Sequence, residues 1–438
     1  MAHIRPFRAY RYDPAVVGQL GQVTFPLIDR VLATHADRYR QVPHHAVHLS
    51  VPASPQAAAQ AWVTLQAEGV FVRDPLPGIY PYYQRYSLYG DNQVHLRKGF
   101  IALVRLETLD GAPTLRIHEG VLPQAVERQL AIFEATRLNA APTHVLYHEP
   151  SGELEQYLDA AMQPPLAEVA DAQGVVHQLG ILQHYPTLRR IQQLLSPLAL
   201  YVADGHHRLE VAQRHYARVR HLPGTPPDPL AGYHLVYLTN TATDRQTILP
   251  THRLVALEAG FDSEAFWAGL GEHFELQPTD SRRPLYQQLV EQPQAIGVII
   301  NQKQALLRLK PGVRPEDLVP ADLPLSVRRL AYTGVHYQVL GRLLGIPYAE
   351  QASSPRIEYT KDLARVIDRA CTEGGAPTLG LVMPEVTLPE LLAVADDGAR
   401  MPPKSTYFYP KVLAGLTFAS LRDEDPTPPF DEAFAVGA

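Results

Sequence analysis

The 438-residue sequence is long enough for two or three domains, and its 46% hydrophobic and 19% charged residues are typical of a globular protein. Its formal net charge of −6 argues against a general nucleic-acid-binding protein, and its single cysteine excludes a disulfide within the chain. No apolar run approaches the roughly 20 residues of a membrane span and the N-terminus lacks the apolar core of a signal peptide, so we expect a cytoplasmic protein with no membrane partner.

The first part of the chain mixes strand and helix patterns. Alternating basic and apolar residues predict an extended segment at residues 4–12, and further strands are expected at residues 79–86 and 99–106. Helices are expected at residues 56–68 and 122–139, where apolar positions recur on one side. Strands and helices continue to alternate after residue 150, which predicts an α/β architecture.

The central part of the chain carries a strand, a turn and a helix. The apolar run at residues 198–203 predicts a buried strand, Gly205 can turn the chain, and residues 209–216 predict a helix with one apolar side. That helix end presents free N–H groups and the positive end of a dipole, which suits a phosphate. The polar residues placed there are Asp204, His206, His207 and Arg208, and Arg208 adds a permanently charged fork.

Asp204 does not fit a purely anion-binding role. A carboxylate beside bound phosphates usually holds a divalent cation such as Mg²⁺ or accepts a proton. Asp204 is therefore both the candidate metal ligand and a candidate catalytic residue. The alternative is that Asp204 only caps the helix, since aspartate is a favoured N-cap, and that its polar neighbours are solvated residues of the first helical turn.

Two later segments also carry polar side chains in short loops. His252 and Arg253 follow the strong strand expected at residues 233–240, and they either contact a substrate or phosphate or only anchor the loop. Prolines fix the loop at residues 401–411, which offers one cation and two hydroxyls for a second anion-binding site. Those three residues are Lys404, Ser405 and Thr406, and we expect Lys404 to lie near Asp204.

The pattern of the chain changes after residue 258. We therefore expect an N-terminal and central α/β region over residues 1–258 and a C-terminal α/β region over residues 259–438. In the second region residues 327–344 predict one long helix and residues 378–383 a buried strand. The acidic, proline-rich tail at residues 423–438 is expected to be loose.

Residues 203–208 resemble the Asp-Gly-His-His-Arg signature of the domain-of-unknown-function 1015 (DUF1015) family. Residues 401–411 resemble that family's Met-Pro-x-Lys-Ser-Thr-x-Phe-x-Pro-Lys signature. A related Gly-x-His-Arg pattern lines a nucleotide-phosphate site in the superfamily of ParB, sulfiredoxin and free serine kinase. The resemblance implies a mixed α/β fold with a ParB/sulfiredoxin-like nucleotide-binding core and an additional α/β region.

The resemblance also implies further site residues. Family members show a His-Glu step, an Arg-x-Asn pattern and a Pro-x-His-Arg pattern, matched here by His118 and Glu119, by Arg137 and Asn139, and by His252 and Arg253. Glu119 is the candidate second carboxylate, acting as a general base or a cation ligand, or else it belongs to a surface pair. The other five would contact the substrate.

These features favour a nucleotide-binding enzyme that transfers a phosphoryl group to a small hydroxyl substrate, with ATP or ADP and Mg²⁺ as cofactors. The residues expected to bind the phosphates are Gly205, His206, His207, Arg208, Lys404, Ser405 and Thr406, and those expected to act in catalysis are Asp204, Glu119 and His206. Free serine kinase implies serine as the acceptor. The alternative is a ParB-like nucleotide-dependent switch, whereas sulfiredoxin chemistry would need a cysteine in the turn. The sequence does not indicate an oligomeric state.

Overall fold

The computed structural model describes residues 2–27, 36–88, 91, 93–107, 112–244, 246–279, 285–292, 295–301, 303–372 and 377–422. The chain forms two compact units: unit 1 comprises residues 1–116, 121–246 and 410–438, and unit 2 comprises residues 117–120 and 247–409. The chain therefore passes between the units four times. The expected division after residue 258 lies inside unit 2, and the tail at residues 423–438 lies outside the described residues.

Unit 1 is built on a mixed sheet with the strand order β10-β11-β5-β6-β13-β9-β12-β7, to which β1 adds by pairing with β6. Its strands are β1 (Ile4–Arg5), β5 (Tyr80–Ser87), β6 (Val94–Arg105), β7 (Leu115–Arg116), β9 (Thr143–Tyr147), β10 (Ala167–Ala170), β11 (Val176–Leu179), β12 (Leu200–Asp204) and β13 (Tyr233–Asn240). Strand β13 runs parallel to β9 and antiparallel to β6, and all of its residues are buried. The predicted mixed α/β class is confirmed.

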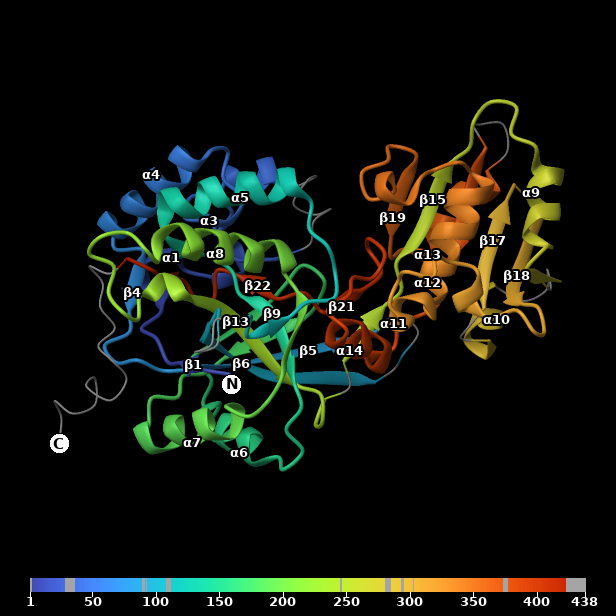
Figure 1. Cartoon of the computed structure of the whole chain (residues 1–438). Coiled ribbons are helices and arrows are strands. Elements are labelled where there is room, and N and C mark those ends of the chain that lie inside the picture. The colour runs from blue at the N-terminus through green and yellow to red at the C-terminus, as the bar shows by residue number, and fades with distance from the viewer. Residues whose placement is uncertain are drawn as a thin grey trace. The chain divides into compact units, whose positions relative to one another are not determined.

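Helices cover both sides of this sheet, with α5 and α8 on one side and α6 and α7 on the other (Figure 1). Among the described residues of unit 1 the helices are α1 (Pro14–Val17), α3 (Val47–Ser50), α4 (Pro55–Ala67), α5 (Pro123–Thr136), α6 (Glu153–Ala161), α7 (Tyr185–Leu195) and α8 (His206–Val219), with the 3-10 turns η1 (Leu20–Gln22) and η2 (Leu230–Gly232). Helix α8 packs against α5 in a cluster that includes Val211 and Leu130. It also packs against β9 and β13, which fixes its start beside the sheet.

The C-terminal segment at residues 410–422 completes unit 1. It contributes β22 (Leu413–Ala414), which pairs with β3 (Phe25–Pro26), and β23 (Ala419–Ser420), which pairs with β8 (Leu138–Asn139). A further short pair joins β2 (Tyr10–Tyr12) to β4 (Phe71–Arg73). Leucines of the segment pack into the core of the sheet with aromatic side chains of β5 and β13. The last described part of the chain is therefore built into its first unit.

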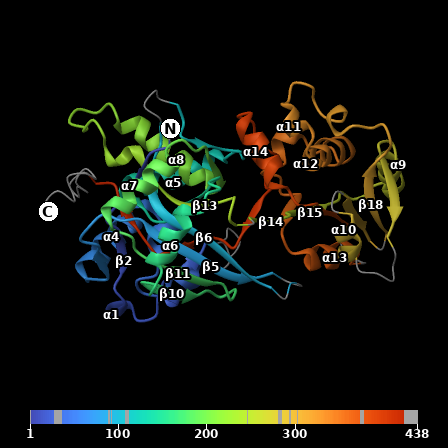
Figure 2. The ribbon, with the colours of Figure 1, turned by 90° about the horizontal axis from the view of Figure 1, so that it is seen from below.

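Unit 2 holds an antiparallel sheet in the order β16-β18-β17-β20-β15-β19, and β14 pairs separately with β21. Its strands are β14 (Thr247–Leu249), β15 (His252–Ala256), β16 (Phe274–Pro278), β17 (Ile296–Ile300), β18 (Lys303–Leu309), β19 (Ile357–Thr360), β20 (Thr378–Val382) and β21 (Tyr407–Tyr409). Its helices are α9 (Ser263–Leu270), α10 (Leu285–Glu291), α11 (Leu325–Arg328), α12 (Ala331–Gly334), α13 (Leu363–Cys371) and α14 (Leu388–Asp396), with η3 (Pro315–Asp317), η4 (Val335–Leu343) and η5 (Tyr348–Glu350). Helices α10 and α13 pack on one side of the sheet, and α11 and α12 lie on the other (Figure 2).

Two expected elements of unit 2 differ from the structure. The single helix expected at residues 327–344 is interrupted at Leu330, whose extended conformation separates α11 from α12, while α12 continues directly into the π-helical η4. The loop expected at His252 and Arg253 is the start of strand β15. None of the described helices combines the length and the apolar character that crossing a membrane requires.

Gly99 tests the close approach of β6 and β13. A Cβ atom added at Gly99 would collide with the carbonyl oxygen of Leu238. We expect Gly99→Ala to destabilise the protein by about 1–3 kcal/mol, the usual cost of over-packing a core, and to lower the melting temperature followed by circular dichroism. Gly21→Ala is the control, because its Cβ would meet its nearest neighbour at an ordinary 3.5 Å. Equal melting temperatures for the two variants would contradict this packing.

Candidate functional site in the turn between β12 and α8

The predicted strand, turn and helix are present. Asp204 ends β12, His206 begins α8, and Gly205 stands between them with φ of 100°, a left-handed conformation that favours glycine. A Cβ atom at Gly205 would lie 2.6 Å from Nη2 of Arg208 and 2.9 Å from Oγ1 of Thr143. Glycine is therefore required both for the turn and for the close approach of the Arg208 guanidinium to the backbone.

Asp204 forms an ion pair and does not cap helix α8. Gly205 occupies the N-cap position, and no side chain accepts a capping hydrogen bond there. Oδ2 of Asp204 lies 3.3 Å from Nζ of Lys411, whose side chain is 10% exposed, whereas that of Asp204 is 30% exposed. The capping alternative is therefore not what the structure shows.

Neighbouring positive groups control the charge of Asp204. Burial alone would raise the pKa of this carboxyl group, but Lys411, Arg208, His206 and His144 together hold its pKa far below the ordinary range. Asp204 is therefore ionised at neutral pH. A carboxylate with such a low pKa is a poor proton acceptor, so the surroundings of Asp204 disfavour general-base catalysis.

The other residues of the turn hold neighbouring segments. Nε2 of His207 accepts a hydrogen bond from the backbone N–H of Leu122 at 3.0 Å, and Leu122 is the N-cap of α5. Nη2 of Arg208 donates to the carbonyl oxygen of Pro142 at 3.3 Å. His206 is buried, with 7% of its surface exposed. The turn is thus fixed to the segments that precede α5 and β9.

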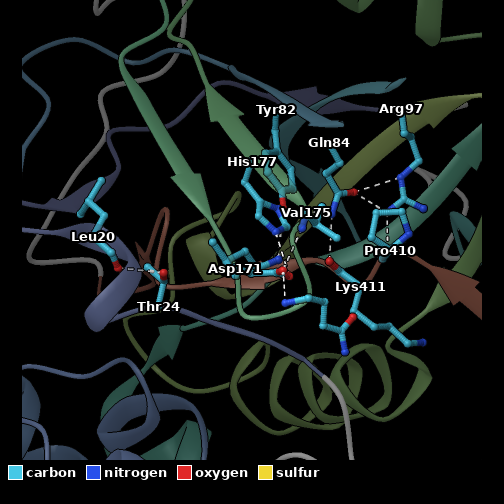
Figure 3. A network of polar contacts seen from close by, with 12 residues as sticks. Leu20, Thr24, Tyr82, Gln84, Arg97, Asp171, Val175, His177, Pro410 and Lys411 are labelled. Carbon is cyan, nitrogen blue, oxygen red and sulfur yellow. Dashed lines mark hydrogen bonds and ion pairs between the residues drawn. The ribbon is translucent and has the colours of Figure 1, made fainter. Parts of the chain in front are cut away.

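Several residues near the turn were not singled out from the sequence. Lys411 is the ion-pair partner of Asp204, and the buried side chains of Arg97 and Gln84 contact the backbone beside it (Figure 3). Buried His144, whose pKa lies well below its usual value because of burial, is held against Oγ1 of Thr239 at 2.8 Å. The sequence does contain a signal for Arg97, since a charge in an apolar strand is costly to bury.

A second cluster of predicted residues lies within unit 2. Oε1 of Glu119 accepts a hydrogen bond from the backbone N–H of Lys404 at 3.3 Å, and Nε2 of His118 lies 3.2 Å from Oγ1 of Thr406. Oγ of Ser405 donates to the carbonyl oxygen of Pro402 in the same loop. Lys404 has φ of 54°, a left-handed conformation that costs a non-glycine residue energy and is concentrated at functional sites.

Arg253 supports the backbone of the Lys404 loop. Its fully buried guanidinium donates to the carbonyl oxygens of Pro403 at 3.2 Å and Lys404 at 3.4 Å, and it lies 2.9 Å from Nε2 of His336. Nδ1 of neighbouring His252 accepts a hydrogen bond from the backbone N–H of Met383, just after β20, at 3.1 Å. Burial lowers the pKa of His252 to about 4. These contacts are the ones expected if His252 and Arg253 only anchor the loop. Substrate binding by the two residues stays a prediction.

Arg137 and Asn139 lie at the end of α5. Arg137 ends this helix in a left-handed conformation, and its carbonyl oxygen accepts from the backbone N–H of Leu421 at 2.9 Å. Asn139 is buried in β8, opposite Ala419. These backbone contacts attach the C-terminal segment, and a substrate role for the two side chains stays a prediction.

The predicted site residues thus form two groups. Unit 1 brings Asp204, His206 and Arg208 together with Lys411, and unit 2 brings His118 and Glu119 together with the Lys404 loop. Because Lys404 and Asp204 belong to different units, their expected proximity stays a prediction.

The family model described as "Protein of unknown function (DUF1015)" matches residues 4–332. The chain belongs to this family. The resemblance expected from the motifs of this DUF1015 protein is confirmed, and no curated protein matches it.

Several solved structures are similar to this DUF1015 protein. A mutant of free serine kinase in complex with AMP is 11% identical, with a TM-score of 0.38 and coverage of 74% of this chain and 94% of that chain. Free serine kinase in complex with AMP is 13% identical, with a TM-score of 0.37 and coverage of 74% and 93%. A conserved hypothetical protein from Pyrococcus furiosus is 12% identical, with a TM-score of 0.36 and coverage of 74% and 96%.

The low pKa of Asp204 predicts how stability depends on pH. Because the folded pKa lies below the unfolded value of about 3.9, the carboxylate stabilises the fold above that pH, and this contribution falls by roughly 1.4 kcal/mol per pH unit below it. Asp204→Asn removes the charge. The difference in free energy of unfolding between wild type and variant should be constant from pH 7 to 5 and shrink between pH 4 and 3, as measured with urea.

A control variant separates this effect from the general response to acid. Asp37→Asn changes a carboxylate whose side chain is 94% exposed, so its stability should follow that of the wild type at every pH. A wild-type advantage over Asp204→Asn that is as large at pH 3 as at pH 6 would contradict the depressed pKa of Asp204.

Proposed function

We propose that this DUF1015 protein is a nucleotide-binding phosphotransferase that acts on a small hydroxyl substrate. The observation that carries the proposal is the arrangement at the turn, where the ionised carboxylate of Asp204 faces the basic side chains of Lys411 and Arg208 at the start of α8. Phosphoryl transfer depends mainly on neutralising charge and aligning the reactants, and these groups supply both requirements.

Three features support binding of the nucleotide phosphates at residues 204–208. The N-terminus of the 14-residue helix α8 directs backbone N–H groups at the turn. Arg208 and Lys411 leave an excess of positive charge over the single carboxylate of Asp204. The motif itself resembles the Gly-x-His-Arg pattern that lines a nucleotide-phosphate site in the superfamily of free serine kinase.

Asp204 fits a magnesium ion that is carried by the phosphates. Among the residues that the structure describes, no group of three or more histidine, cysteine or acidic side chains is placed to hold a metal ion. Mg²⁺ is commonly bound by one or two carboxylates together with substrate phosphates, so one carboxylate is a sufficient protein contribution. When bound, the ion would neutralise charge on the phosphates, and Asp204 would hold it.

The proposed reaction is an in-line transfer. The hydroxyl oxygen of the substrate forms a bond to the terminal phosphorus of ATP or ADP, the bond from that phosphorus to its bridging oxygen breaks, and the hydroxyl proton passes to a carboxylate or to solvent. Arg208 and Lys411 would stabilise the charge that develops on the phosphoryl oxygens. Glu119 is the second proposed carboxylate, with Lys404, Ser405 and Thr406 as a second phosphate-binding loop. Serine is the first acceptor to test.

Arg208 tests where the phosphates bind. Losing one charge-assisted contact should weaken the binding of ADP or ATP by roughly 1.5–3 kcal/mol in isothermal titration calorimetry of Arg208→Ala. Arg218→Ala is the matched control on the same helix, because its exposed side chain pairs with Glu134 and should leave the affinity unchanged. If the wild type binds nucleotide and Arg208→Ala binds it equally well, the phosphates bind elsewhere.

Asp204 tests the chemistry. Asp204→Asn keeps the size of the side chain and removes its charge, so we expect single-turnover phosphate transfer to serine and other hydroxy amino acids to slow by roughly 10²–10⁴ while nucleotide stays bound. Glu210→Gln on α8 is the control, since Glu210 pairs with Arg214 at the surface. Nucleotide hydrolysis without any acceptor would favour the switch instead, and full activity of Asp204→Asn would remove Asp204 from the mechanism.

A further inference from the structure

Lys411 approaches the turn from the C-terminal segment of unit 1. Its Nζ lies 3.3 Å from Oδ2 of Asp204, which is longer than the 2.7–2.9 Å of a strong charge-assisted hydrogen bond. Its side chain is 10% exposed, so its ammonium group has lost much of its contact with water. A partly desolvated cation attracts an added phosphate more strongly than a fully hydrated one, because water screens it less.

The charge balance around Asp204 also favours an added anion. The basic side chains of Lys411 and Arg208 both act on this one carboxylate. A third basic side chain, that of Arg97, is close enough to lower the pKa of His144, which also borders Asp204. The single carboxylate of Asp204 is therefore outnumbered by the basic side chains that act on it, in a region where screening by water is reduced.

Buried side chains of two neighbouring strands fix the backbone at Lys411 (Figure 3). Nε2 of Gln84 donates to the carbonyl oxygen of Lys411 at 2.9 Å, and Nη2 of Arg97 donates to the carbonyl oxygen of Pro410. Arg97 also binds Oε1 of Gln84 through Nε at 3.0 Å, so the two side chains brace each other. Both are almost completely buried, at 0% exposure for Gln84 and 1% for Arg97.

The same support continues on the other side of Lys411. The backbone N–H of Leu413 donates to the hydroxyl oxygen of Tyr82 at 3.1 Å, and that hydroxyl lies 2.7 Å from Nδ1 of His177. Nε2 of His177 in turn lies 3.3 Å from Oδ2 of Asp171. The backbone is thus held on both sides of Lys411, which places its side chain beside Asp204.

We propose that Lys411 is a phosphate-binding residue of the turn and that Gln84 and Arg97 are positioning residues that hold it there. This inference rests on the proposed phosphate site at residues 204–208 and extends it to a lysine on a distant segment of the chain. In the absence of ligand, Asp204 occupies the position of an anion beside Lys411. When a phosphate binds, the ammonium group of Lys411 pairs with it in place of Asp204.

The experiment measures the affinity of the 438-residue protein for pyrophosphate, ADP and ATP by calorimetry. Lys411→Met should weaken the binding of each about 10- to 100-fold, and Lys411→Arg, which keeps the charge, should restore most of that affinity. Lys98→Met is the matched control. Lys98 neighbours Arg97 on β6 and pairs with Asp159 at 2.8 Å, so its loss should leave pyrophosphate affinity unchanged.

A double-mutant cycle separates positioning from general structural damage. Gln84→Met removes the hydrogen bond to the Lys411 carbonyl and should weaken pyrophosphate binding about 3- to 10-fold in the wild-type background. In the Lys411→Met background the same change should have little further effect, because the residue it positions is gone. An equal loss in both backgrounds would overturn the positioning role of Gln84.

The possible results also distinguish this inference from the proposed function. If wild type binds nucleotide and Lys411→Met binds it equally tightly, the role of Lys411 is overturned while the nucleotide site stands. If wild type binds pyrophosphate but neither ADP nor ATP, the nucleotide proposal fails. The pyrophosphate affinities of wild type and Lys411→Met then still test the role of Lys411. If none of the three ligands binds, both proposals fail. Lys411→Gln provides a second neutral variant if Lys411→Met does not fold.

Discussion

The buried charge of Arg97 is the constraint on which unit 1 depends. A guanidinium with 1% exposure is destabilising by several kcal/mol unless other groups replace its hydration. Arg97 meets this requirement with Oε1 of Gln84, the carbonyl oxygen of Pro410 and the face of the Tyr237 ring, which lies 5.7 Å from the guanidinium carbon. Because one of these partners belongs to the C-terminal segment, stabilising the charge also docks that segment on the sheet.

The electrostatic character of the turn follows from this docking. Residues 410–413 bring an ammonium group to the end of β12, where Arg208 of α8 already supplies a guanidinium. These two groups hold the pKa of Asp204 far below its usual range, although burial alone would raise it. The charge of the site therefore comes from three segments that are far apart in the sequence, and the helix end contributes only one part of it.

The sequence predicted those features of the site that depend on local pattern. The strand expected at residues 198–203, the turn at Gly205 and the helix expected at residues 209–216 are confirmed as β12 and α8, because apolar runs and a glycine between them act within a few residues. The strand at residues 233–240 is confirmed for the same reason. The helix expected at residues 327–344 is continuous only from Ala331 onward, since the extended conformation of Leu330 leaves no mark on the apolar periodicity.

The missed residues depend on tertiary structure. Lys411 ends the motif at residues 401–411, yet only the folded structure shows that its side chain reaches Asp204. Lys404 of the same motif belongs to unit 2. The sequence also could not show that Arg253 supports a loop, because its partners at residues 403–404 are distant and are backbone carbonyl groups. Backbone partners of this kind carry no side-chain signature.

Because the chain returns to unit 1 after forming unit 2, unit 1 can be completed only late in biosynthesis. Gln84 and the carbonyl of Lys411 are 327 residues apart, so the sheet that is translated first receives its closing segment last. Until residues 410–422 leave the ribosome, the side chains of Arg97 and Gln84 have no carbonyl groups of that segment to bind. A nascent chain would therefore present an incomplete unit 1 throughout the synthesis of unit 2, which is a long period of exposure to chaperones and proteases.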